Sequence, residues 1–189
     1  MRIALFGGTF DPIHNAHLAV AREAADRFRL DRVLFIPAAH PPHKQHGAHA
    51  PYDDRVRMAE LATAGDSRFC VSRLEQGAGH SYSIDTIERV RPTLAADDRL
   101  FFIIGADAFA EIQTWRRWRD VAEAVCFLVV SRPNSRYDPP PEVRFERLDT
   151  LSLPVSSSEV RAALAAGRRP PELPDAVLQY IEERGLYRP

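Results

Sequence analysis

Lysine is almost absent from this sequence, in which Lys44 stands alone against 24 arginines. A surplus of either charge is absent too, because the formal net charge of the 189 residues is -1. A chain so close to neutrality has no global attraction for nucleic acid or an anionic membrane, so any anion site must be local. Since ammonium and guanidinium groups bind phosphate differently, the single lysine is a candidate for a specific role.

Cysteine and long apolar runs are also scarce. Cys70 and Cys126 each lie in a short apolar stretch, which favours buried free thiols and a reducing, cytoplasmic compartment. No apolar run approaches the ~20 residues that span a bilayer. The N-terminus leads directly into a strand pattern, so we expect no secretory leader. Length and composition fit one globular domain over residues 1–189.

Short apolar runs alternate with helical patterns along the chain. Strands are predicted at 3–6, 33–36, 69–74, 100–104 and 125–130, with a weaker one at 143–148. Helices are predicted at 15–28, from a cap at Asp53 or Asp54 through Met58 and Leu61, at 83–90, around 115 and 118, at 157–166 and at 174–184. This pattern predicts a doubly wound, Rossmann-like α/β fold, with a parallel sheet covered on both faces and a C-terminal helical portion at about 156–189. Such sheets bind ligands at the carboxyl ends of their strands.

The segment after the first predicted strand, Gly7 to His17, carries the strongest functional signal. Gly7 and Gly8 would let the backbone turn tightly and bring amides close to an anion, and the next helix N-terminus favours negative charge. His14 and His17 are three residues apart, so they share one face of the first helical turn and can point at one phosphate. Either histidine alone would fit an ordinary strand–turn–helix junction. The segment lacks the G-x-G-x-x-G fingerprint, so a redox dinucleotide site loses its usual support.

A second candidate anion site lies at residues 155–161. Ser156 to Ser158 form a good N-cap cluster for a helix, and Glu159 suits the first turn. Arg161, about one turn in, could reach the same anion as the helix amides. A capped helix with a solvated arginine would explain these residues by themselves. Paired with the first motif, they indicate a second phosphate clamp.

Both motifs resemble signatures of the nucleotidylyltransferase superfamily, G-G-T-F-D-P-x-H-x-G-H and I-S-S-T-x-I-R. Residues 81–87 and Gly105 to Asp107 followed by Trp115 are similar to elements of the branch that makes dinucleotide cofactors, and 42–44 and 131–133 also fit. Along nearly its full length the chain resembles bacterial nicotinate mononucleotide adenylyltransferases. The resemblance implies transfer of the adenylyl group of ATP to nicotinate mononucleotide, giving deamido-NAD and pyrophosphate by direct in-line attack without a covalent intermediate.

The resemblance also implies roles for individual residues. His17 would be the principal transition-state donor, with His14, Lys44 and Arg161 as the other catalytic residues. ATP would contact Gly7, Gly8, Thr9, Phe10, His14, His17, Gly105, Asp107, Ser156, Ser157, Ser158 and Arg161. The mononucleotide would contact Thr9, Lys44, Ser81, Tyr82, Ser83, Thr86, Trp115 and Arg132, with Trp115 or Tyr82 stacking on the pyridine ring. Mg²⁺ would arrive with ATP and keep mostly water ligands, so no dedicated protein metal site is expected.

Three residues depart from the family pattern. Ala16 replaces the glycine of H-x-G-H and places a methyl group where the helix should approach the nucleoside, whereas Ser83 and Ser158 replace threonines and keep the hydroxyl. Nicotinamide mononucleotide remains an alternative acceptor. Residues 81–86 argue against phosphopantetheine adenylyl transfer. Ala16 is the only residue that favours a non-catalytic nucleotide-sensing module. No nucleic-acid or membrane partner is expected, and the sequence permits a homo-oligomer.

Histidine recurs every third residue at His40, His43, His46 and His49, which raises the alternative of a metal site. The prolines and the glycine between these histidines argue against a helix, so the four side chains would not share a face. We interpret the segment as a substrate-closing loop that carries Lys44.

Overall fold

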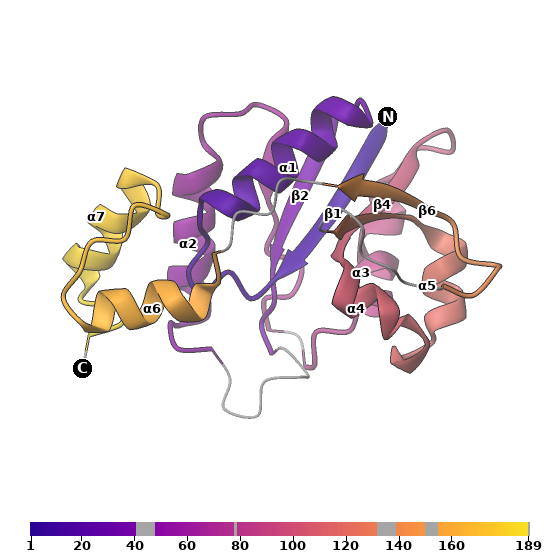
Figure 1. The fold of residues 1–189 in the computed structure, drawn as a ribbon. Coiled ribbons are helices and arrows are strands. Elements are labelled where there is room, and N and C mark those ends of the chain that lie inside the picture. The colour runs from indigo at the N-terminus through magenta and orange to yellow at the C-terminus, as the bar shows by residue number, and fades with distance from the viewer. Residues whose placement is uncertain (41–47, 78, 132–138, 150–154, 189) are drawn as a thin grey trace.

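A computed structural model of the protein describes residues 1–40, 48–77, 79–131, 139–149 and 155–188 (Figure 1). Its centre is a six-stranded sheet in which every neighbouring pair is parallel, in the order β3-β2-β1-β4-β5-β6. The strands are β1 (Arg2–Gly8), β2 (Arg32–Pro37), β3 (Phe69–Val71), β4 (Arg99–Gly105), β5 (Cys126–Ser131) and β6 (Phe145–Asp149). The predicted doubly wound α/β fold is confirmed.

Helices cover both faces of this sheet (Figure 1). One face packs against α1 (Asn15–Arg27) and α2 (Tyr52–Thr63), with α6 (Ser157–Ala165) and α7 (Asp175–Arg184) beside them. The other packs against α3 (Ser83–Val90), α4 (Ala106–Ala110) and α5 (Trp118–Ala124), together with the 3₁₀ turn η2 (Ile112–Thr114); a second 3₁₀ turn, η1 (Arg91–Thr93), follows α3. Successive strand residues alternate between the two cores: Phe101 packs in the first and Phe102 in the second. This alternation explains why the strands are apolar throughout.

The strand order reverses between β1 and β4, which are neighbours although two strands separate them in the sequence. The carboxyl ends of these two strands therefore form the edge at which a ligand is expected. Within the described part of the chain, the helices lack the combined length and apolar character that crossing a membrane would require.

Local details differ from the sequence predictions at several places. No helix was predicted at α4, and Trp115, expected in a short helix, has an extended backbone after η2. Pro51, in an extended conformation, takes the N-cap position of α2, so the predicted cap at Asp53 or Asp54 is wrong and both carboxylates lie in the first turn. The third strand is shorter than predicted, since β3 ends at Val71. Cys70 and Cys126 are free, as predicted, but half-buried instead of buried.

Candidate active site

The first motif turns at a residue that the sequence did not single out. Gly7 and Gly8 still belong to β1, where they pair with Ile36 and Pro37 of β2, so the prediction that the glycines form the turn is wrong. The left-handed conformation falls on Phe10, with a φ of 48°. A Cβ atom on Gly8 would lie 3.0 Å from the Phe10 ring. A side chain at position 8 would therefore require this buried ring to shift, whereas glycine lets it fold back over the end of the strand.

His14 and His17 form a stacked pair at the start of α1. His14 is the N-cap residue, and the two ring centroids lie 3.7 Å apart with planes inclined by 25°. The predicted shared face is confirmed. The backbone N–H of His14 donates to Nδ1 of His17 at 3.2 Å, so the neutral His17 ring carries its proton on Nε2. That proton makes His17 a hydrogen-bond donor on the side facing away from the helix backbone.

Both histidines are uncharged near neutral pH. Burial lowers the pKa of His14 to about 4, against the weaker opposing effect of Glu172. Burial also holds the pKa of His17 well below its usual value, and His14 adds to this shift. Among the described residues, the buried Nδ1 of His14 has no hydrogen-bond partner. A buried polar atom without a partner is unfavourable, and a bound phosphate group could satisfy it.

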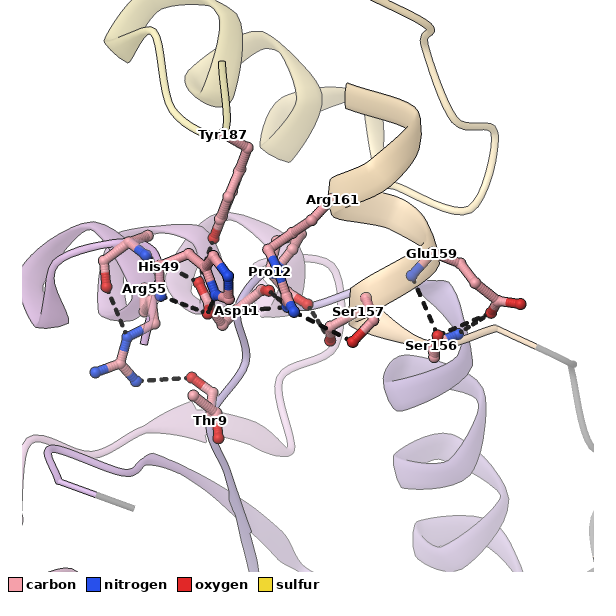
Figure 2. A network of polar contacts seen from close by, with 12 residues as sticks. Thr9, Asp11, Pro12, His49, Arg55, Ser156, Ser157, Glu159, Arg161 and Tyr187 are labelled. Carbon is pink, nitrogen blue, oxygen red and sulfur yellow. Dashed lines mark hydrogen bonds and ion pairs between the residues drawn. The ribbon is translucent and has the colours of Figure 1, made fainter. Parts of the chain in front are cut away.

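The second motif packs directly on the first, as Figure 2 shows. Ser156 caps α6 through a reciprocal pair of contacts with Glu159, which confirms the predicted N-cap cluster. The Ser157 hydroxyl donates to the Pro12 carbonyl at 3.1 Å. Arg161 donates to the backbone carbonyl of Asp11 at 2.7 Å and to the Ser158 hydroxyl at 3.1 Å. The two predicted phosphate clamps, far apart in sequence, are thus brought together.

Asp11 is a central residue whose side chain the sequence reasoning missed. Its carboxylate is fully buried and accepts hydrogen bonds from the backbone amides of His49 and Ala50, at 2.8 and 3.0 Å, and from the Tyr187 hydroxyl at 2.8 Å (Figure 2). Burial alone would raise the pKa of Asp11, but these hydrogen bonds hold it below its usual value. The ionised carboxylate therefore ties the first motif to residues 38 and 176 positions away.

A cavity of about 270 Å³ opens at the carboxyl ends of β1, β2 and β4. It brings together predicted residues from both substrate groups: Gly7, Gly8, Thr9 and Gly105 with Ser81, Ser83, Thr86 and Trp115. Trp115 packs its edge against the ring of Phe102, with centroids 6.0 Å apart. Phe6 of β1 lines the cavity and also contacts the His17 ring, with centroids 6.1 Å apart, so β1 borders both this cavity and the histidine pair.

Several predicted site residues lie elsewhere. Tyr82, the N-cap of α3, is not among the residues that line the cavity; its ring lies 5.7 Å from that of His80 and 5.0 Å from the Arg116 guanidinium. Asp107 is exposed in the first turn of α4. Ala16 is half-buried in the first turn of α1. Lys44, Arg132, His43 and His46 lie outside the described residues.

Glu75 is a second residue that the sequence reasoning missed. It is 5% exposed and lines the cavity, where it accepts hydrogen bonds from the Thr86 hydroxyl at 2.7 Å and the Ala39 amide at 3.3 Å. Its nearest sequence signal is the polar stretch after the third strand, which has no periodic pattern. The structure thus gives Thr86 a partner within the protein.

Metal ligands are not clustered in the part of the chain that the structure describes: it holds no group of three or more His, Cys, Asp or Glu side chains suited to an ion. His49, one of the four regularly spaced histidines, places Nδ1 3.2 Å from the Asp11 carboxylate. His40 donates its backbone amide to the Ser81 hydroxyl at 3.1 Å. The two described histidines of this group thus contact different parts of the site: His49 contacts the first motif, and His40 contacts Ser81.

Comparisons with known proteins agree on one family. The model of the Cytidylyltransferase-like family matches residues 5–163. A Solibacter usitatus protein named as a probable nicotinate-nucleotide adenylyltransferase is 67% identical over 187 residues, which cover 99% of this chain and all of that one. A Thermus thermophilus protein of the same name is 44% identical over 190 residues and the full length of both chains.

A solved structure extends this agreement to the fold. Plasmodium falciparum nicotinic acid mononucleotide adenylyltransferase complexed with NaAD superposes with a TM-score of 0.80 over 98% of this chain and 97% of that one, at 18% identity. Because the family match spans both phosphate motifs and the relatives match from end to end, this chain belongs to the cytidylyltransferase-like family and, within it, to the nicotinate-nucleotide adenylyltransferases.

Proposed function

We propose that this protein transfers the adenylyl group of ATP to nicotinate mononucleotide, which forms deamido-NAD and releases pyrophosphate in NAD biosynthesis. One observation carries the proposal: β1 and the following Thr9 line the cavity, and Phe6 of the same strand contacts His17 of the stacked pair. A mononucleotide in the cavity and a triphosphate over the histidines would meet at the end of this strand. The names of the relatives support the same reaction.

The chemistry requires alignment and charge stabilisation. A phosphate oxygen of the mononucleotide attacks the α-phosphorus of ATP; a new P–O bond forms, and the bond to the departing pyrophosphate breaks with its electron pair. No enzyme nucleophile is needed, and the hydroxyls of Ser156, Ser157 and Ser158 all take part in local hydrogen bonds. The Nε2–H of His17 would donate to an α-phosphate oxygen as charge develops there.

The second motif would hold the leaving group. The α6 N-terminus favours an anion, and Arg161 lies one turn inside it, against the Asp11 carbonyl. The side chain of Asp11 is saturated by its own hydrogen bonds, so it is not free to act as a metal ligand. The site therefore fits a Mg²⁺ ion that would be held by phosphate oxygens and water. Such an ion would neutralise charge on the departing pyrophosphate. Asp107, Lys44 and Arg132 keep their proposed substrate-binding roles.

The acceptor is tested by a parallel assay of the two pyridine mononucleotides. Purified protein is incubated with ATP, Mg²⁺ and either nicotinate or nicotinamide mononucleotide, and both pyrophosphate and dinucleotide are measured. We expect deamido-NAD as the favoured product. Product from the amide alone would replace the acceptor in our proposal, and ATP binding without dinucleotide from either would indicate a nucleotide-sensing module instead.

Other partners and the location of the protein belong to the same proposal. We propose a cytoplasmic protein with small-molecule substrates and no nucleic-acid or membrane partner. The unpaired thiols of Cys70 and Cys126 and the formal net charge of -1 support it.

A further inference from the structure

Arg55 of α2 is the bulkiest of the fully buried side chains, with 1% of its surface exposed. Its Nε donates to the Ala50 carbonyl at 3.1 Å, and its Nη1 donates to the carbonyls of Thr9 at 2.7 Å and Ala38 at 2.8 Å. These three carbonyls belong to the segment before α2, to the residue that follows β1 and to the residue that follows β2. A buried guanidinium stays charged, so its burial is unfavourable unless hydrogen bonds and opposite charges compensate.

Two buried carboxylates supply that opposite charge. Burial lowers the pKa of Arg55, and the negative charges of Asp11 and Glu75 act against this shift. Asp11 lies on the side of the site that holds the two phosphate motifs, here called the phosphate side. It accepts a hydrogen bond from the amide of Ala50, and the carbonyl of Ala50 accepts one from Arg55. Glu75 lies on the other side, in the wall of the cavity. Arg55 is therefore the cation shared by the two halves of the site.

One peptide unit shows how tightly the halves are connected. The peptide group between Ala38 and Ala39 accepts a hydrogen bond from Arg55 at its carbonyl oxygen. Its N–H group donates a hydrogen bond to Glu75. The other carboxylate oxygen of Glu75 accepts the Thr86 hydroxyl of α3. The segment just after β2 is thus fixed between a buried cation and a buried anion, and the same cation fixes Thr9, just after β1.

We propose that Arg55 is a positioning residue that sets the spacing between the phosphate loop, defined as residues 9–17, and the mononucleotide cavity. This inference rests on the proposed function, because the spacing matters only if two substrates meet at the end of β1. Arg55 holds Thr9 and Ala38 through their backbone carbonyls and is not among the residues that line the cavity. Its loss should therefore disturb the alignment of the two substrates far more than the binding of either one.

The variant Arg55→Lys keeps the buried charge but cannot reach three carbonyls with a planar fork. We expect its kcat to fall by ~10–100-fold, since misplacing reacting groups by about 1 Å has effects of this size. Calorimetry should show that nicotinate mononucleotide alone, and a non-hydrolysable ATP analogue alone, bind within about 3-fold of the parent. Arg57→Lys is the matched control, because Arg57 is exposed on the same helix and pairs with Glu60 at 3.2 Å; it should behave as the parent.

Glu75→Gln is the second variant, and it decides the matter if Arg55→Lys does not fold. It removes one charge of the network at constant size, so kcat should fall in the same direction but less. Two results would overturn the inference: kcat within about 3-fold of the parent in the folded variants, or a Kd for one substrate that weakens as much as kcat falls. A parent protein that forms no dinucleotide contradicts the proposed function itself, whereas a productive parent with equally productive variants contradicts only the role of Arg55.

Discussion

Asp11 and Arg117 both tie distant segments of the site together, but they do so in opposite surroundings. Asp11 is fully buried and joins the phosphate loop to His49, Ala50 and Tyr187. Arg117 is exposed; it follows Trp115 by two residues and pairs with Glu88 of α3 and Asp120 of α5, both at 2.7 Å. Removing one partner of a buried charged network is strongly destabilising, whereas exposed ion pairs contribute little.

The two parts of the site therefore differ in how their residues are held in place. The phosphate side, where bonds break, is fixed by buried groups that move only when the fold is disturbed. The mononucleotide side has the buried Glu75 in common with that network but adds surface pairs, including Arg116 with Asp85 at 3.5 Å. Substitutions on the phosphate side should therefore have the larger effects.

The largest effect is expected for His17→Ala. Loss of a transition-state donor should lower kcat by ~10²–10³-fold, measured by initial rates at saturating ATP and nicotinate mononucleotide. His80→Ala is the control, because His80 is exposed and lies outside the cavity lining. Near-parental turnover of the His17 variant would remove this histidine from its central role.

Asp11→Asn should cause the next largest effect. The amide would turn a donor toward groups that themselves donate, and it would remove the charge near Arg55. We expect the free energy of unfolding to fall by ~3 kcal/mol, measured by urea denaturation. Asp53→Asn, at an exposed residue paired with Arg73, should leave stability unchanged. Equal stability of the Asp11 variant and the parent would show that the buried charge is dispensable.

The stability of the phosphate side should depend on pH through His14. Its pKa of about 4 in the folded protein lies below the ordinary value of 6.5, so the unfolded chain takes up the proton first as the pH falls. The contribution is complete above pH 6.5 and is lost between there and about pH 4, by roughly 3 kcal/mol. Urea denaturation of His14→Gln should show a flatter pH dependence than the parent over this range. Identical slopes would contradict the burial of a neutral imidazole.

Arg117 should give the smallest effect and the sharpest test of the exposed side. Its φ of 51° is left-handed, so Arg117→Gly relieves backbone strain while Arg117→Ala retains it. Both remove the ion pairs. We expect melting temperatures close to that of the parent, with the glycine variant above the alanine variant, and a few-fold rise in KM for the mononucleotide at unchanged KM for ATP. Unchanged KM for both substrates would show that these pairs do not position Trp115.

Much of the fold was predictable because it follows from local patterns. Unbroken apolar runs such as the one in β4 are typical of strands buried on both faces, and α3 begins and ends at the predicted residues. The spacing of His14 and His17 predicted their shared face. Local signals failed where two rules compete: Pro51 took the cap position of α2, and Phe10 took the turn that the glycines were expected to form.

The network beneath the site was not predictable in this way. Arg55 lies 46 residues from Thr9, and Tyr187 lies 176 residues from Asp11. Contacts between residues so far apart leave no periodic pattern in the sequence. In addition, the sequence does not distinguish a buried arginine on a helix from a solvent-exposed one. Charged residues in apolar surroundings become interpretable only once the fold shows which backbone carbonyls face them.

The hydrogen bond from Tyr187 to Asp11 also determines when the contacts of Asp11 can be completed during synthesis of the chain. A ribosome makes the phosphate loop 176 residues before it makes the tyrosine that completes the Asp11 contacts. A nascent chain therefore carries both histidines and the turn at Phe10 while the carboxylate beneath them still lacks its last donor. The Asp11 contacts on the phosphate side can therefore be completed only after Tyr187 has been translated, 176 residues after Asp11 itself.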